Sequence, residues 1–515
     1  FIDPETDLDN ASVDSPLIKK KDGGTMQAYS YTIVIIVSLF FFGIVYWNFR
    51  KFKTSLEGYV VDRNNVNSWT SISTLVSSIL GAWILFSPSE AGTWSGINGI
   101  LGYSFGQALP FVAFAFIGTR IRELMPSGHS VTEFVKYRYG SLGHSFVAII
   151  SIFYMLVFLC AELTGISSAA NMIGGIPNWI TALIIGLCAS TYVVVGGIKA
   201  SIFTDKYQFR FILPLIIIGV LTIYLNSSVT KEFNNLDNGL MSFSNWTGGK
   251  FGLTLMIAIL SANMFHQGLW QRIYSVTDNK SLIKSFTISG IIVIPVVFIF
   301  GFIGILAVGI LPEGANPSIV LFDTIMKISP QWVIMIFLVL AVMLVASSLD
   351  TLFNSISSII GTDLKDFLSK DSNSPFTISL SKAMKITPYL CLIPAVIIAS
   401  QGYSVLYLFL IADMVCCAIL FPVFFGLYSS KFNGNDAVIS MITGLIIGTL
   451  LFPNPDLGTF EWFKSIPYSG DLFASFYMSF ISSALISFLL FVKNNISSRQ
   501  GFVFSSLNKN ISSLD

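Results

Sequence analysis

The stretch MLVASSLDTLFN, residues 343–354, lies inside an apolar run that extends over about 332–360. A run of this length can cross a lipid bilayer as a helix. Residues three, four and seven positions apart share one side of a helix, so the run carries a polar stripe made of Ser347, Asp350 or Thr351, and Asn354. An ionisable residue inside the membrane is costly and faces the protein interior or water, which makes Asp350 a functional candidate.

Oxygen atoms dominate this stripe. The hydroxyls of the adjacent Ser347 and Ser348 and the carboxylate of Asp350 are the kind of ligand that a hard cation prefers. The alternative is structural, because serine hydroxyls often bond back to carbonyls of their own helix and Asp350 could satisfy a polar group of a neighbouring helix. The stretch alone leaves both interpretations open.

The composition indicates a membrane protein. Of the 515 residues, 53% are hydrophobic and 11% are charged, whereas soluble domains carry roughly 25% charged residues. We therefore predict an all-α polytopic protein with the lipid bilayer as its surroundings. A net charge of +1 without a basic tract gives no support for a nucleic-acid partner. The five cysteines all fall in apolar segments, which argues against a disulfide framework or a zinc cluster.

Thirteen apolar runs are candidate membrane spans. They lie at about 28–49, 69–90, 97–118, 145–170, 178–197, 207–225, 252–275, 285–311, 331–360, 384–400, 404–428, 435–452 and 472–492. If the N-terminus is outside, most Lys and Arg residues, for example Arg50, Arg120 and Arg272, fall in the inner segments. The positive-inside rule then predicts a cell-membrane protein with an outside N-terminus and a cytoplasmic C-terminus.

The spans divide into groups. Spans two to six and seven to eleven are two sets of five, and because five is odd the second set runs in the opposite sense to the first. Inverted repeats of this kind are typical of secondary transporters. The predicted organisation is a polar tail at 1–27, an extra helix at 28–50, repeats at 69–225 and 252–428, two further helices at 435–492 and a polar cytoplasmic tail at 493–515.

Both repeats begin with an interrupted helix, as transporters of this kind require. In the first repeat, Gly81 is followed by SPSEAG from Ser87. In the second, the span ILSANMFHQGLWQR (259–272) carries several amides and a histidine. Glycine and proline are common in membrane helices, so one interruption is weak evidence. Two at matching positions favour a transporter in which the breaks form the binding sites.

Four stretches of the chain carry a family resemblance: WTSISTLVSSILGAW (69–83), GHSVTEFVKYRYG (128–140), VVVGGIKASIFTDKYQ (193–208) and ASSLDTLFNSISSIIGTDL (346–364). The last two are the specific ones. Together the four stretches resemble the sodium/solute symporter family, nearest to its urea and proline permeases. The resemblance implies a LeuT-type fold of two inverted five-helix repeats, preceded by one helix and followed by two.

The resemblance also implies a sodium site between the first and eighth core helices. The residues that match are Ser77 and Leu80 on the first, and Leu344, Ser347 and Ser348 on the eighth, with the two serines giving hydroxyls and the others carbonyls. Some relatives bind a second cation, and the matching residues here are Ser347, Asp350, Thr351 and Asp205. A carboxylate at Asp350 departs from the family pattern and could strengthen a cation site, bind a proton or pair with a cation. Asp205 could instead line the ion exit path or cap its helix.

A pocket in this fold would draw on several core helices. The expected substrate-binding residues are Trp83, Gln107, Asn263, His266, Gln267, Trp270 and Gln271. The stretch ANMFHQGLWQR resembles the urea permeases, but His266 stands where they have an acid, which puts urea itself in doubt. Glu162 and Asp413 are further acids within spans. Glu162 is interpreted as a substrate or proton group, and Asp413 as a contact between helices.

The predicted function is sodium-coupled symport of a small polar organic solute, such as urea or an amino acid, into the cell by alternating access. The sodium ion is the coupling ion, and no other cofactor is expected. A proton-coupled symporter is one alternative, in which Asp350 or Glu162 would titrate. A solute sensor that does not transport is another. No cofactor or nucleophile motif supports an enzyme.

Overall fold

The computed structural model describes residues 23–51, 55–226, 229, 238–370, 380–497, 500–511, 513 and 514. The first 22 residues of the expected polar tail lie outside this described part. Regular structure in the described residues is helical, apart from a single parallel β-bridge between Val66 and Val276. The all-α prediction is therefore confirmed.

The helices follow the apolar runs of the sequence. In chain order they are α1 (Gly23–Phe49), α2 (Leu56–Val60), α3 (Ser68–Ile79), η1 (Ala82–Leu85), α4 (Ser87–Leu124), α5 (Val131–Gly174), α6 (Asn178–Tyr224), α8 (Asn238–Met241), α9 (Trp246–Asn263), α10 (Gln267–Ser275), α11 (Asn279–Ile310), η2 (Pro317–Ile319), α12 (Val320–Ile328), α13 (Gln331–Lys370), α14 (Leu380–Ala399), α15 (Val405–Phe425), α16 (Gly434–Leu451), η3 (Glu461–Phe463), α17 (Leu472–Ile496) and α18 (Ser505–Asn510).

Within the described residues, ten helices are long and apolar enough to cross a membrane, or eleven if α9 and α10, which meet at 60°, form one span. The expected thirteen spans stay a prediction. Two features lower the count. The expected span at 69–90 is divided among α3, η1 and the start of α4, and α6 runs through both of the runs at 178–197 and 207–225.

Glycines with positive φ interrupt long helices and let the chain change direction between two helical segments. Gly96 in α4 and Gly197 in α6 have φ values of 61° and 57°, which glycine adopts without steric cost. A Cβ atom on Gly197 would lie 2.6 Å from the backbone oxygen of Tyr59, so the position also requires a close approach. The Gly-Gly pair of the third family motif therefore joins two helical segments of α6.

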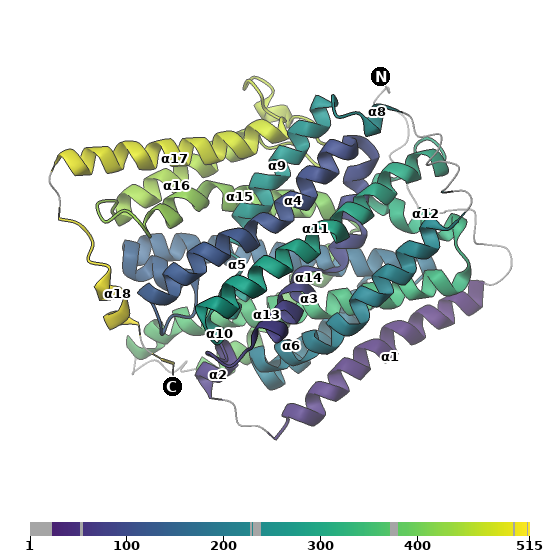
Figure 1. The fold of residues 1–515 in the computed structure, drawn as a ribbon, viewed down its shortest axis with the longest axis horizontal. Helices are drawn as coiled ribbons and strands as arrows, with labels where there is room; N and C mark the ends of the chain where they lie inside the picture. Colours follow the sequence, from purple (N-terminus) through teal and green to yellow (C-terminus); the bar gives the residue numbers. More distant parts are fainter. Residues whose placement is uncertain are drawn as a thin grey trace.

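Helix α13 occupies the centre of the bundle. In the most apolar 18-residue segment of α13, 78% of the residues are buried. The corresponding segments of α1 and α17 are each 28% buried. Helix α13 packs against α5 and α6, while α4 packs against α9 and α11. Helix α1 lies along one edge of the molecule, and α16 and α17 lie along the opposite edge (Figure 1). The polar stripe of α13 is thus placed inside the protein rather than against lipid.

Candidate functional site

The first core helix breaks directly after α3. Leu80 has an extended conformation (φ −77°, ψ 91°), Gly81 is extended as well, and the chain resumes as η1. The freed amides of η1 are taken by a carboxylate from α5: Ala82 N–H donates to Glu162 Oε2 at 2.6 Å, and Trp83 N–H lies 3.4 Å from Oε1. A Cβ atom at Gly81 would lie 2.2 Å from Glu162 Oε1, so the absent side chain makes room for the acid.

The same carboxylate reaches the serine pair of α13. Ser348 Oγ donates to Glu162 Oε2 at 2.7 Å, and both side chains are fully buried. The Leu344 carbonyl lies 3.3 Å from Ser348 Oγ. Leu80, at the break, is fully buried as well. Glu162 therefore joins the break of the first core helix to the residues expected to supply a sodium site.

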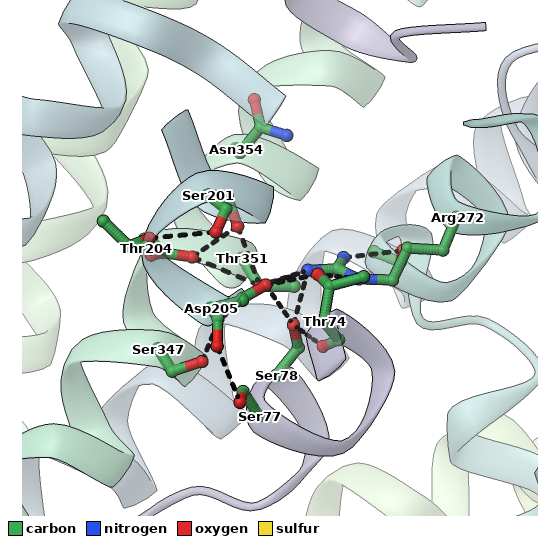
Figure 2. Close-up of polar contacts among 12 residues, drawn as sticks. Thr74, Ser77, Ser78, Ser201, Thr204, Asp205, Arg272, Ser347, Thr351 and Asn354 are labelled. Atoms are coloured by element: carbon green, nitrogen blue, oxygen red, sulfur yellow. Dashed lines mark hydrogen bonds and ion pairs between the residues drawn. The ribbon is translucent and has the colours of Figure 1, made fainter. Parts of the chain in front are cut away.

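The second serine faces a different acid, Asp205 of α6. Ser347 Oγ donates to Asp205 Oδ1 at 2.5 Å, and Ser77 Oγ donates to the Asp205 carbonyl at 3.2 Å. Thr74 and Ser78 of α3 donate to Oδ2 (Figure 2). Ser347 and Ser348 are neighbours on one helix, so two carboxylates lie on either side of a short row of hydroxyls.

A buried guanidinium completes this network. Arg272 of α10 is 1% exposed, and its Nη2 lies 2.9 Å from Asp205 Oδ2 (Figure 2). Its hydrogen bonds reach side chains or backbone of α3, α6, α10 and α13, with partners Thr74, Ser78, Asp205, Gly268 and Thr351. By sequence, Arg272 counts as a cation of an inner segment. Its place inside the apolar span 252–275 is the signal that could have identified it.

Asp350 is surrounded by hydroxyl groups. Its Oδ1 accepts from Ser201 at 2.6 Å, and its Oδ2 accepts from Thr204 at 2.9 Å and Tyr192 at 3.0 Å. Thr351, also predicted here, donates to Oδ1 at 3.3 Å and receives Nη2 of Arg272 at 3.0 Å. In the described part of the chain no cationic side chain pairs with Asp350. The region thus holds three carboxylates and one guanidinium.

A cavity of about 30 Å³ lies beyond the break, between α3, α4, α5, α9 and α15. Space of this size holds little more than a water molecule, so a solute requires side chains to move. The lining residues are Ile79, Trp83, Tyr103, Gln107, Tyr154, Phe158, Leu255, Ile259, Asn263, Leu406, Phe409, Leu410 and Asp413. Three of the expected substrate residues, Trp83, Gln107 and Asn263, meet here.

The other four expected substrate residues do not line this cavity. His266 caps α10 by accepting from Gly268 N–H at 3.1 Å. Gln267 donates to the His129 carbonyl at 2.8 Å. Trp270 Nε1 donates to the Met264 carbonyl, and Gln271 donates to the Val60 carbonyl. The structure places them in contacts around the second break because they follow the bend, whereas Asn263 precedes it.

Sequence reasoning missed the place of Asp413 as well as that of Arg272. Asp413 was interpreted as a contact between helices, yet its side chain lines the cavity together with five aromatic rings. The rings come from η1, α4, α5 and α15, which lie far apart in the sequence. No local sequence pattern predicts that these five rings lie around one cavity.

Comparisons with known proteins find membrane transporters. A profile of the Sodium:solute symporter family matches residues 59–444. A Candida albicans protein described as a spermidine transporter is 26% identical over 430 residues, which cover 82% of this chain and 78% of that protein. A probable urea active transporter of Schizosaccharomyces pombe is 24% identical over 265 residues, which cover 47% of this chain and 37% of that protein.

The fold has a solved counterpart. A sodium-coupled sialic acid symporter in a substrate-bound outward-open state superposes with a TM-score of 0.70 at 18% identity, over 91% of this chain and 98% of that one. At this identity the likeness shows the fold, which is the LeuT-type arrangement that the four motifs imply. The expected family is confirmed by the profile match over most of the chain. The chain belongs to the sodium:solute symporter family and is a multi-pass secondary active transporter, not an enzyme.

Proposed function

We propose that this transporter couples the entry of sodium ions to the uptake of a small polar organic solute. The observation that carries the proposal is the pair of adjacent hydroxyls on α13, where Ser347 faces Asp205 and Ser348 faces Glu162 beside a broken helix. Hydroxyl, carbonyl and carboxylate oxygens are the ligands of hard cations. The expected carbonyl ligands, from Ser77, Leu80 and Leu344, belong to the two helices that meet here.

The charge balance supports a cation at this place. Glu162, Asp205 and Asp350 are all fully buried, and Arg272 supplies one positive charge for the three acids. A buried carboxylate without a counter-charge is expensive, so a further cation or proton stabilises the arrangement. An ion that binds one conformation more tightly shifts the population toward it, which is how ion binding drives alternating access.

We also propose that residues 69–225 and 252–428 are the two inverted repeats. Both begin with a break in the described structure, after Ile79 in the first and after Asn263 in the second. The bias of Lys and Arg supports an outside N-terminus and a cytoplasmic C-terminus. Each sodium ion that enters down about 100 mV then contributes roughly 2.3 kcal/mol, enough for roughly fiftyfold accumulation of a neutral solute.

Uptake by the purified protein in liposomes tests the proposal. Radiolabelled spermidine and urea, the substrates named for relatives, would be supplied with proline and glucose under an inward sodium gradient or with potassium in its place. We expect sodium-dependent accumulation that is lost in Ser348→Ala. The matched control is Ser357→Ala on the same helix, because the Ser357 hydroxyl is equally buried and, among the described residues, bonds only to the Phe353 carbonyl. Equal uptake in sodium and potassium would reject sodium coupling.

Proton coupling is the second candidate, and Asp350 is the observation that favours it. A carboxylate held by hydroxyls of Ser201, Thr204 and Tyr192 is suited to exchange a proton as well as to support a cation. In that case a pH gradient without sodium would drive uptake, and Asp350→Asn would abolish the response. Uptake that follows sodium at constant pH and survives Asp350→Asn would exclude it.

A further inference from the structure

We infer that the transported solute is an organic cation with an ammonium group, and that the carboxylate of Asp413 binds this group inside the aromatic cavity. The inference rests on the proposed transport function, because it assigns the solute of the same cavity. It names a chemical class that the proposed function leaves open.

The first observation is that the buried carboxylate of Asp413 has no partner in the part of the chain that the structure describes. Its side chain is 5% exposed and lines the cavity. Within the described residues no side chain or backbone group donates a hydrogen bond to its carboxylate, and no cation pairs with it. Glu162 and Asp205, by contrast, each accept hydrogen bonds from at least two groups. A buried carboxylate without donors is costly, and a ligand that brings positive charge and N–H donors removes that cost.

The second observation is the ring of aromatic side chains around this acid. Trp83 stacks on Tyr103 with ring centroids 5.8 Å apart and meets the edge of Phe409 at 6.3 Å. Phe409 in turn contacts Phe158 at 4.8 Å, and Phe158 contacts Tyr154 at 6.0 Å. The faces of Trp, Tyr and Phe attract cations, and such cages are used to bind ammonium groups. An acid and several aromatic faces in one cavity therefore favour an amine.

The cavity also holds polar side chains that can accept hydrogen bonds from an ammonium group. The Asn263 side-chain nitrogen donates to the Ile259 carbonyl at 2.9 Å, which leaves its side-chain oxygen as an acceptor. Asp413 is also an acceptor. Gln107 lines the cavity too, and its amide oxygen is a third acceptor for a ligand with several N–H groups. The amide nitrogen of Gln107 and the two tyrosine hydroxyls of the cavity are donors, which suit a further polar group of the same solute. The sequence suggested that Asp413 forms a contact between helices, but no described residue forms a hydrogen bond or an ion pair with its carboxylate.

The cavity is linked to the expected ion site through η1 and α5. Trp83 lines the cavity, while its own N–H and that of Ala82 face Glu162. Tyr154 and Phe158 line the cavity from the helix that carries Glu162, each four residues from the next, so the three share one face. An ion that orders Glu162 and the break would thereby position Trp83 for the amine.

Uptake in liposomes with Asp413→Asn tests the inference. The probes are radiolabelled spermidine, putrescine and ethanolamine as amines, with urea and glucose as neutral solutes, all under a sodium gradient. We expect at least one amine to accumulate and its uptake to fall about tenfold or more in Asp413→Asn. The matched control is Asp436→Asn on α16, because Asp436 is a buried acid that already accepts from Asn494 and lies outside the cavity. Its uptake should stay near that of the wild type.

A second measurement separates a lost binding group from a misfolded protein. Addition of sodium should raise the Tm of purified Asp413→Asn as much as that of the wild type, because Asp413 lies apart from the serine pair. Loss of this response would contradict the assignment of Asp413 to solute alone. Sodium-driven uptake of urea or glucose but of no amine would overturn the inference and leave sodium symport standing. Amine uptake that is equal in sodium and potassium would overturn sodium coupling, and the inference would then stand only if that uptake still falls in Asp413→Asn.

Discussion

The two broken helices look alike in sequence and differ in how their free backbone groups are satisfied. At the first break, the amides of Ala82 and Trp83 face Glu162, an acid contributed by another helix. At the second, between α9 and α10, His266 accepts from Gly268 two residues later, and Trp270 donates to the Met264 carbonyl. The second break is closed by its own residues. The first depends on a charge that an ion can share.

An interruption of a helix therefore does not by itself mark a binding site. A break that is locally capped holds its shape without a ligand, whereas one that is closed by a distant acid is sensitive to whatever binds that acid. Arg272, at the far end of the second broken helix, connects the two by reaching Thr74 of the first. We therefore expect the two breaks to be separate in function and to be joined through this arginine.

The largest effect is expected for Arg272→Gln. The change leaves Asp205 buried without its counter-charge, and removal of one partner of a buried pair typically costs about 3–5 kcal/mol. We expect a large loss of thermal stability in detergent and loss of uptake. The double variant Arg272→Gln with Asp205→Asn should recover part of the stability. Lys464→Gln is the control, because Lys464 pairs with Glu461 on the exposed surface and should show no measurable change. Equal thermal stability of Arg272→Gln and Lys464→Gln would contradict a role of Arg272 in joining the two breaks.

An effect of intermediate size is expected when one residue at each break is changed, and it distinguishes the roles of the two breaks. Glu162→Gln keeps the shape of the side chain but removes the charge beside Ser348, so the sodium concentration for half-maximal uptake should rise about tenfold or more. His266→Asn keeps a good capping side chain at the start of α10 and should leave the sodium dependence of uptake unchanged. A similar shift in both variants would show that the second break belongs to the ion site too.

The smallest effect concerns a polar cluster outside the spans that touches the second break. Gln267 donates to the His129 carbonyl, and the His129 ring lies between Glu57 and Glu133. Burial disfavours the charged imidazolium, but the hydrogen bonds and charges of Glu133 and Glu57 outweigh it and raise the pKa of His129. Burial likewise disfavours the Glu57 carboxylate, but the hydrogen bond and charge of His129 outweigh it and lower the pKa of Glu57 to about 2.

These directions fix the pH dependence. The stability from Glu57 is complete above its ordinary pKa of 4.5 and is lost as the pH falls toward 2. That from His129 is complete below 6.5 and is lost as the pH rises through the raised pKa. The Tm difference between the wild type and His129→Gln should therefore be largest between pH 5 and 6.5, where it is worth about 1 kcal/mol, and should shrink as the pH rises through the raised pKa of His129. A constant difference over this range would contradict the assignment.

The sequence predicted those parts of the site that depend on local pattern. The spacing on α13 placed Ser347, Asp350 and Thr351 toward the protein interior, where the structure has them. Gly81 indicated the first break, and the four motifs indicated the family. Trp83, Gln107 and Asn263 were assigned to a pocket and meet in one cavity.

The remaining parts depend on contacts between distant segments. Arg272 and Asp205 are 67 residues apart and pair only after α6 and α10 have packed on α13. The positive-inside rule counts Lys and Arg by their place in the sequence, so it does not recognise a cation that becomes buried in the folded protein. Asp413 stands alone in an apolar helix, and its meaning comes from rings on other elements. Such groupings follow from tertiary packing, which periodicity does not contain.

The closeness of Gly81 and Glu162 has a consequence for how such transporters evolve. The carboxylate occupies the space that any side chain at position 81 would need, since a Cβ atom there would lie 2.2 Å from Oε1. Neither residue can then change freely while the other remains. Relatives with a short residue in place of Glu162 should tolerate alanine or serine in place of Gly81, and relatives that keep the acid should keep the glycine. The two positions should therefore vary as a pair across the family.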